Sequence, residues 1–157
     1  MDFTFTEEQE AFRQTIRTFV KRETSRELDR RLEEEGRFPL ELVDKMAETG
    51  LLGLPFPEQY GGAGGDVMDF IIAAEELAYG SEAACAIFLG PVFFAGEMIT
   101  LNGSEAQKQK YLVPLVKGER IGALAITEPK VGSDTAGMET SAVWNEKQQC
   151  WILNGEK

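Results

Sequence analysis

The sequence predicts a mainly α fold, in which a helical bundle over residues 1–119 is followed by the first strands of a β part over residues 120–157. Up to Gly118, apolar residues recur at helical spacing between capping signals. After Gly118, short apolar runs rich in β-branched and aromatic residues are separated by polar turns. Two or three short strands are marginal on their own. We therefore expect the chain to be part of a longer protein, with the β domain truncated.

The first helix is predicted to begin at Thr6, because Thr6-Glu7-Glu8-Gln9 has the pattern of a capping box. Its apolar face is Phe12, Ile16, Phe19 and Val20. Its polar face is Arg13, Gln14, Arg17 and Lys21. The highly charged residues 23–35 predict a solvated helix or a frayed one.

Pro39 predicts the first turn of a second helix, which stops at Gly50. Its apolar stripe is Leu40, Val43 and Ala47. A loop rich in proline and glycine follows over residues 51–65, and it needs positive φ at some of its glycines. We expect Phe56 and Tyr60 to hold this loop in place.

Three further helices complete the predicted bundle. The first runs from Asp66 to Gly80, and Ser81 caps the next. A second capping box at Ser104–Gln107 opens a short helix that we expect Pro114 to end.

The second of these helices contains an almost entirely apolar window, Ala83–Leu101, which is about the length of roughly 20 residues that crosses a bilayer. Glu97 lies inside this window, Gly90-Pro91 interrupts it, and no Lys or Arg flanks it closely. We therefore expect a helix buried inside a soluble bundle, not on its surface, and no membrane segment.

The β part is predicted to contain up to three short strands. Ile121–Ile126 is an apolar run, and Ser141–Trp144 and Cys150–Leu153 carry β-branched and aromatic residues. The polar segment Asn145–Gln149 between the last two predicts a hairpin loop.

Composition excludes several classes of function. The chain has no histidine, so histidine-dependent nucleophile systems and His-ligated metals cannot come from it. A net charge of −11 argues against nucleic-acid binding and against an anionic membrane surface. The two cysteines, Cys85 and Cys150, have no paired spacing, which indicates neither a disulfide framework nor a metal site. Without a secretory signal pattern at residues 1–10, we expect a cytoplasmic location.

The segment AITEPKVGSD, residues 125–134, combines turn-forming residues with two hydroxyl side chains in one short stretch, here called the corner. One interpretation is an ordinary loop turned by Pro129 and Gly132. The other is a site rich in donors, in which free amides around Gly132 and the hydroxyls of Thr127 and Ser133 bind an anion or the polar edge of a ring. The local residues alone do not decide between them.

A series of motifs along the chain resembles the acyl-CoA dehydrogenases. In order they are FTEEQ at 5–9, GLLGLPFPEQYGGAGG at 50–65, EELA at 75–78, SEAQKQKYLVPLVKGE at 104–119, ITEPKVGSD at 126–134 and LNGEK at 153–157. The resemblance implies an N-terminal helical domain of acyl-CoA dehydrogenase type, and an enzyme that desaturates an acyl-CoA thioester between its α and β carbons. It also implies FAD as cofactor, an electron-transfer flavoprotein as the usual reoxidant, and a homo-oligomeric full-length protein.

The resemblance assigns FAD contacts to five residues of this chain. Leu124, Ile126 and Thr127 are expected beside the isoalloxazine ring, and Gly132 and Ser133 at the diphosphate. Ser133 is also expected near the CoA arm of the substrate. The chain departs from the family pattern at two neighbouring positions, because Lys130 and Val131 stand where Gly and Ala are frequent. Position 124 also varies in the family, where some members have an aromatic residue.

The resemblance assigns acyl contacts to the helix over 81–103, where we select Phe88, Pro91, Val92 and Ala95. A purely structural role in the core is the alternative for each. The catalytic base is expected in a C-terminal helical domain that this chain does not contain. We therefore interpret Glu128 as a turn residue, name no catalytic residue or metal ligand, and predict that the chain alone is inactive.

Two other functions are compatible with the sequence. A flavin-dependent acyl-CoA oxidase, or another member of the same superfamily, would share these motifs. A non-catalytic helical interaction module, in which the corner at 125–134 is only a turn, is the alternative from another class.

Overall fold

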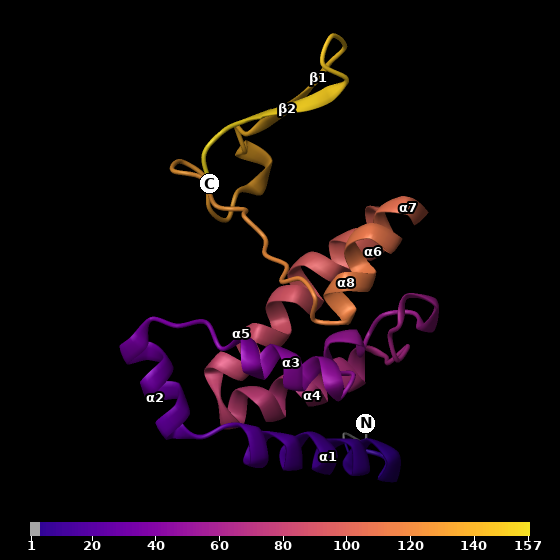
Figure 1. The fold of residues 1–157 in the computed structure, drawn as a ribbon, viewed down its shortest axis with the longest axis vertical. Helices are drawn as coiled ribbons and strands as arrows, with labels where there is room; N and C mark the ends of the chain where they lie inside the picture. Colours follow the sequence, from indigo (N-terminus) through magenta and orange to yellow (C-terminus); the bar gives the residue numbers. More distant parts are fainter. Residues whose placement is uncertain (1–3) are drawn as a thin grey trace. The chain divides into compact units, whose positions relative to one another are not determined.

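A computed structural model describes residues 4–157 of the chain (Figure 1). The chain divides into two compact units, Met1–Ala123 and Leu124–Lys157. The first, here called the helical unit, is entirely helical apart from its loops, and the second, the hairpin unit, contains two strands. The mainly α prediction is therefore confirmed. The boundary expected after Glu119 stays a prediction.

The helical unit contains eight α-helices and four segments of 3-10 or π-helix within the described residues. The α-helices are α1 (Glu7–Glu23), α2 (Arg26–Glu35), α3 (Leu40–Glu48), α4 (Val67–Gly80), α5 (Glu82–Leu89), α6 (Glu97–Asn102), α7 (Glu105–Gln107) and α8 (Val113–Val116). The other four segments are the 3-10 helices η1 (Leu51–Gly53) and η2 (Glu58–Tyr60) and the π-helices η3 (Gly90–Gly96) and η4 (Lys108–Leu112).

The predicted start of α1 is confirmed in detail. The Thr6 hydroxyl accepts the Gln9 N–H at 3.1 Å, and the Gln9 side chain accepts the Thr6 N–H at 3.0 Å. These two bonds satisfy two of the donors that a helix start leaves without partners. Ile16, Phe19 and Val20 are buried, as the periodicity predicts.

The predicted polar face of α1 is only partly a solvent face. Arg13 and Arg17 reach across to Glu76 of α4, whose side chain is buried. Arg13 Nε lies 2.7 Å from the Glu76 carboxylate, and Arg17 Nη2 lies 2.6 Å from it. These bonds, led by that from Arg17, keep the pKa of Glu76 below its ordinary value despite burial. An ion-paired cluster thus joins α1 to α4.

The stripe expected on α3 is partly wrong. Val43 is buried as expected, but Leu40 is 57% exposed, and the inward face consists of Leu42, Val43 and Met46. Leu40 lies at the first position of the helix, where the chain enters from the solvent side. The helix stops as predicted, with Gly50 in the left-handed region at φ +77°.

The loop after α3 is ordered by its aromatic residues, as predicted. Phe56 and Tyr60 are almost completely buried. The packing of the loop requires glycine at position 62, because a Cβ there would lie 2.0 Å from the Phe56 carbonyl oxygen. The core that these residues join also takes side chains from α1, α3, α4, α5, η3, η4 and α8.

The segment Glu82–Asn102 is one continuous helical stretch of α5, η3 and α6, and by length and composition alone it could cross a membrane. The prediction that it lies wholly inside the bundle is wrong. One face, including Phe88 and Val92, is buried, while Phe93, Phe94 and Met98 are 42–51% exposed. Within the described residues, the other helices cover only one side of it.

Pro114 does not end its helix, contrary to the prediction. It lies in the first turn of α8, which continues to Val116. The preceding π-helix shifts the hydrogen bonds, so that the Val113 N–H reaches the Lys108 carbonyl. Proline has no N–H to donate, yet the helical stretch that runs from α7 through η4 continues past Pro114 to Val116.

The hairpin unit is built on an antiparallel pair, β1 (Ser141–Asn145) and β2 (Cys150–Asn154). Trp144 and Trp151 are directly opposite each other, with ring centroids 5.6 Å apart in an edge-to-face arrangement. These two strands and their loop are as predicted. Residues 121–126 form no strand, because no strand in the described part of the chain pairs with them.

Candidate functional site

The corner at residues 125–134 is a tight turn closed by a two-residue bridge. The Glu128 N–H donates to the Val131 carbonyl at 2.9 Å, and the Val131 N–H donates to the Glu128 carbonyl at 3.1 Å. Pro129 and Lys130 form the tip of this turn, where proline supplies a φ suited to the bend. The backbone conformation of the corner is therefore defined by the hairpin unit itself.

Glu128 is the one buried residue within the hairpin unit, at 7% exposed. Its carboxylate accepts the N–H of Glu139 at 2.7 Å and the N–H of Thr140 at 3.0 Å, and Lys157 Nζ lies 2.9 Å from it. These contacts lower the pKa of Glu128 to about 2, and the largest contribution comes from the Glu139 N–H, followed by Thr140 and Lys157. Glu128 is thus an ionised anchor, with more partners than the turn residue expected from the sequence.

The donors expected at the corner are accessible. The hydroxyls of Thr127 and Ser133 lie on exposed residues, and so do the N–H groups of Thr127, Gly132 and Ser133. No group within residues 4–157 accepts a hydrogen bond from these donors. Leu124 and Ile126 are also about two-fifths exposed. The structure thus places all five residues expected to bind FAD on the surface of one small unit.

Gly132 is not required by the packing of the chain. Its φ is not positive, and a Cβ built on it would meet nothing within 4 Å. Gly62 shows the opposite case, where a Cβ would collide with backbone. A glycine without an internal reason is typical of a position where a ligand approaches the backbone closely.

The four residues expected to contact the acyl chain do not share one surface. Phe88 and Val92 are fully buried, and the Phe88 ring stacks on Phe70 with centroids 5.2 Å apart. Val92 borders a cavity of about 380 Å³, whereas the half-buried Ala95 borders a different groove. Pro91 lies in η3, and its side chain is outside the described ones. Their role stays a prediction.

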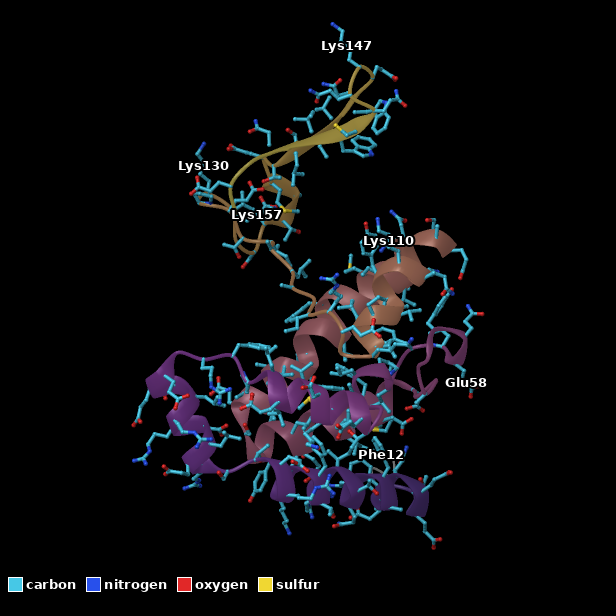
Figure 2. All side chains as sticks on the ribbon, viewed as in Figure 1. Phe12, Glu58, Lys110, Lys130, Lys147 and Lys157 are labelled. Atoms are coloured by element: carbon cyan, nitrogen blue, oxygen red, sulfur yellow. The ribbon has the colours of Figure 1, made fainter. Side chains whose placement is uncertain are left out.

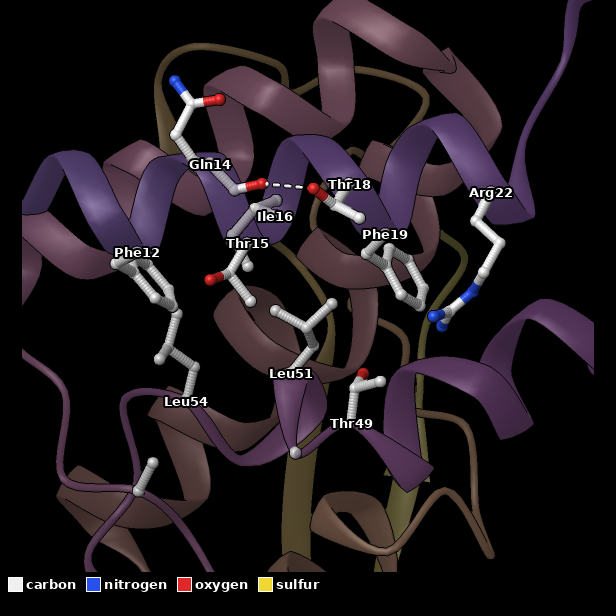
Figure 3. Close-up of a pocket in the computed structure, with 12 residues that line it drawn as sticks. Phe12, Gln14, Thr15, Ile16, Thr18, Phe19, Arg22, Thr49, Leu51 and Leu54 are labelled. Carbon is white, nitrogen blue, oxygen red and sulfur yellow. Dashed lines mark hydrogen bonds between the residues drawn. The ribbon is translucent and has the colours of Figure 1, made fainter.

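An apolar groove of about 560 Å³ lies elsewhere in the helical unit, between α1 and the loop that follows α3. Figure 3 shows Phe12, Phe19 and Leu51 along it, with Leu54 toward one end and Arg22 at the other. None of the residues expected to bind FAD or the acyl group lines it. This apolar groove is thus separate from the residues expected to bind FAD and the acyl group.

Sequence reasoning missed two features near the expected sites. The sequence marks Lys157 only as part of the LNGEK motif, whereas in the structure Lys157 binds both Glu128 and the Ile126 carbonyl, at 2.9 and 3.0 Å. The exposure of Phe93 and Phe94, which follow the buried Val92, was not predicted either. The pairing of Lys157 had no signal in the sequence, since its partners lie about thirty residues away. The exposed Phe pair had one, since Gly90-Pro91 interrupts the helical pattern, and the π-helix η3 begins at that point.

Comparison with known proteins agrees with this fold. The profile of the acyl-CoA dehydrogenase N-terminal domain matches residues 6–119. The chain belongs to the acyl-CoA dehydrogenase family. The motifs from FTEEQ to LNGEK therefore mark this family, as the resemblance indicated.

Three similar proteins extend over nearly the whole chain. The short-chain specific acyl-CoA dehydrogenase of Clostridium acetobutylicum is 43% identical over 157 residues, covering 100% of this chain and 41% of that protein. The CarC subunit of the caffeyl-CoA reductase–Etf complex of Acetobacterium woodii is 40% identical over 98% of this chain and 40% of its own length. The crystal structure of an acyl-CoA dehydrogenase complexed with FAD from Bacillus anthracis superposes with a TM-score of 0.84 at 33% identity, covering 96% of this chain and 26% of that one. The chain thus spans about two-fifths of the two curated relatives.

The donor set at the corner fits FAD. A flavin nucleotide presents acceptors, namely the diphosphate oxygens and the carbonyl and imine groups at the ring edge, and the corner offers donors that can match them. The hydroxyls of Thr127 and Ser133 and the N–H groups of Thr127, Gly132 and Ser133 are all unengaged in the described chain. The open space at Gly132 leaves room for close approach.

Proposed function

We propose that the chain is the N-terminal part of a flavin-dependent acyl-CoA dehydrogenase, which removes two hydrogens from the α and β carbons of an acyl-CoA thioester. The observation that supports this most is the unengaged donor set at Thr127, Gly132 and Ser133, in a chain that belongs to this family. Because relatives are more than twice as long as the chain, the activity belongs to the proposed whole enzyme.

In this proposal the corner residues bind and orient FAD. Bound there, the cofactor would supply an acceptor for the hydride of the β carbon. Gly132 and Ser133 donate backbone N–H groups to an anionic portion of the cofactor, and the hydroxyl of Thr127 donates at the ring. Fixed donors of this kind stabilise negative charge better than water, because they need no reorientation as the charge develops.

No residue of this chain is proposed to remove the α proton. Glu128 is ionised, but its carboxylate already accepts two N–H groups and contacts Lys157. A base must also reach the proton that it takes, and Glu128 is buried behind its own turn. We therefore expect the 157-residue chain alone to show no dehydrogenase turnover.

The proposal includes an electron-transfer flavoprotein as the partner that reoxidises the flavin. It is supported by a 40% identical relative that is a subunit of a complex with Etf. We also propose a cytoplasmic, homo-oligomeric enzyme that binds no membrane or nucleic acid. The net charge of −11 supports the absence of nucleic-acid and anionic-membrane binding, and the two free cysteines support the cytoplasmic location.

The test is the purification of the proposed whole enzyme, followed by its visible absorption spectrum and a turnover assay. We expect a bound-flavin band, and bleaching of that band when an acyl-CoA is added without an acceptor. An artificial acceptor should then support turnover. Absence of the flavin band after incubation with excess FAD would refute the proposal, and stoichiometric peroxide under air would favour the oxidase alternative.

A second function is favoured by one comparison. A relative 40% identical to this chain is a caffeyl-CoA reductase subunit, so the same site could work toward reduction of an α,β-unsaturated acyl-CoA. Desaturation and reduction are the two directions of one reaction, and the electron acceptor or donor that is present decides which direction runs. Steady-state rates with an acyl-CoA plus acceptor, compared with an enoyl-CoA plus a reduced donor, distinguish them.

A further inference from the structure

The hairpin unit contains a polar clamp that no part of the proposed chemistry uses directly. It consists of the Glu128 carboxylate and the Lys157 ammonium, 2.9 Å apart, with Glu128 5% exposed in its side chain and Lys157 25% exposed. An ion pair at this depth is better defined than one on an open surface.

Lys157 holds one peptide of the corner. Its Nζ donates to the Ile126 carbonyl at 3.0 Å. That carbonyl and the Thr127 N–H belong to the same peptide group, which is trans, because the described residues contain no cis peptide. In a trans peptide the oxygen and the hydrogen point in opposite directions. Binding of the Ile126 oxygen by Lys157 therefore turns the Thr127 N–H away from the clamp, where no group of residues 4–157 accepts it.

Glu128 holds a second peptide through its own backbone N–H, while its carboxylate anchors the residue. Its carboxylate ties the turn to the N–H groups of Glu139 and Thr140. Its own N–H donates to the Val131 carbonyl at 2.9 Å. The Val131 oxygen and the Gly132 N–H share one trans peptide, so the Gly132 N–H points away from the bridge. It too is unengaged within the described chain.

We propose that Glu128 and Lys157 are positioning residues for the flavin, acting together to hold the N–H groups of Thr127 and Gly132 outward as cofactor donors. Neither side chain need touch FAD. This inference rests on the proposed function, because it assigns these two residues to the FAD site of that enzyme. Donors that are already fixed lose little freedom when the ligand binds, which increases affinity.

The test measures FAD binding to the proposed whole enzyme, with four single variants. Glu128→Gln and Lys157→Met remove one charge each and keep the side-chain size. Lys157→Arg retains the charge and the donors. Lys147→Met is the control, because Lys147 is an exposed lysine at the hairpin tip with no ion pair in the described chain (Figure 2).

We expect Glu128→Gln and Lys157→Met each to weaken FAD binding about 10- to 100-fold, as when a group supporting a metal ligand is lost. Lys157→Arg should recover most of the affinity, and Lys147→Met should bind FAD as the wild type does. The double variant Glu128→Gln/Lys157→Met should be no weaker than the weaker single variant, because both changes open one clamp.

A second readout does not depend on FAD. In flavin-free protein, amide hydrogen exchange at Glu139 and Thr140 should accelerate in Glu128→Gln, whereas the fluorescence of Trp144 and Trp151 should be unchanged, since the hairpin pairing is separate from the clamp. Loss of the tryptophan signal together with FAD binding would show a merely structural role and overturn the inference.

Two other results would also overturn it, and they differ from each other. Wild-type affinity in Glu128→Gln and Lys157→Met would refute the positioning role while leaving the proposed function intact. Absence of flavin binding in the wild type would refute the proposed function, and the inference with it.

Discussion

The two units of the chain are ordered by different means. The helical unit buries aromatic and aliphatic side chains from most of its helices around Phe56, Phe88 and Met46. The hairpin unit buries only Glu128, and its apolar residues, such as Val143 and Trp151, are 63–65% exposed. The helical unit therefore has its own buried apolar surface, which is the dominant favourable contribution to folding. The hairpin unit is ordered by hydrogen bonds and by two ion pairs, the sheltered Lys157–Glu128 and the exposed Lys130–Glu139.

This difference separates residues that serve the fold from residues that do not. In the helical unit, contacts within the chain explain Gly62, where a side chain would collide with backbone, and Glu76, which forms ion pairs with arginines of α1. In the hairpin unit, Gly132 and the Thr127 hydroxyl have none within the described residues. Residues that the chain itself does not explain are the ones to assign to a ligand.

The largest expected effect is that of Glu76→Ala. The substitution leaves Arg13 and Arg17 without their shared partner and opens a space between α1 and α4. We expect a loss of about 3 kcal/mol in the free energy of unfolding, at the low end for a broken buried ion pair, because both arginines are partly exposed. Urea unfolding followed by helical circular dichroism measures it.

Glu75→Ala is the matched control for that substitution, since Glu75 is exposed on the same helix. It should shift the urea midpoint little. Equal losses in the two variants would mean that the α1–α4 ion pairs contribute nothing specific.

Gly62→Ala should destabilise the helical unit by about 2–3 kcal/mol, the cost of overpacking that the backbone cannot relieve. The added Cβ would lie 2.0 Å from the Phe56 oxygen and 2.4 Å from its carbonyl carbon, so the loop must move. Thermal unfolding is the measurement. A wild-type melting temperature would show that the loop 51–65 adapts freely, contrary to its buried aromatic residues.

Acid should loosen the hairpin unit through Glu128. Its pKa is lowered from 4.5 to about 2, so its stabilising contribution is complete above pH 4.5 and is lost as the pH falls toward 2. The amide NMR signals of Glu139 and Thr140, whose N–H groups donate to the Glu128 carboxylate, report on this loss. We expect a transition in this range that Glu128→Gln lacks. The same transition in wild type and variant would assign it to another group.

Local patterns predicted most of the helical unit, because a capping box or a glycine stop depends on residues three or four apart. Thr6, Ser81 and Ser104 each cap a helix as expected. The sequence could not indicate that Arg13 pairs with Glu76, since sixty-three residues separate them. A glutamate beside the buried Leu77 was the available clue, because buried acids are rarely unpaired.

The candidate site was predicted less completely than the fold. The motif located the donors of Thr127, Gly132 and Ser133, because turn chemistry is local. It did not reveal the clamp, since Lys157 meets Glu128 only after the chain returns from the hairpin. The expected strand over 121–126 failed for a related reason, because strands need a partner that propensity does not supply.

The most direct test of the distinction between the two units is Gly132→Ala, measured for stability and for FAD binding in the same protein. The added Cβ meets nothing within 4 Å, so we expect the free energy of unfolding to change by less than about 0.5 kcal/mol, as for a surface substitution. FAD binding should weaken at least tenfold, because the methyl group occupies the space through which the cofactor approaches the backbone. Unchanged FAD affinity, or a loss of stability as large as that expected for Gly62→Ala, would contradict the assignment of this corner to a flavin.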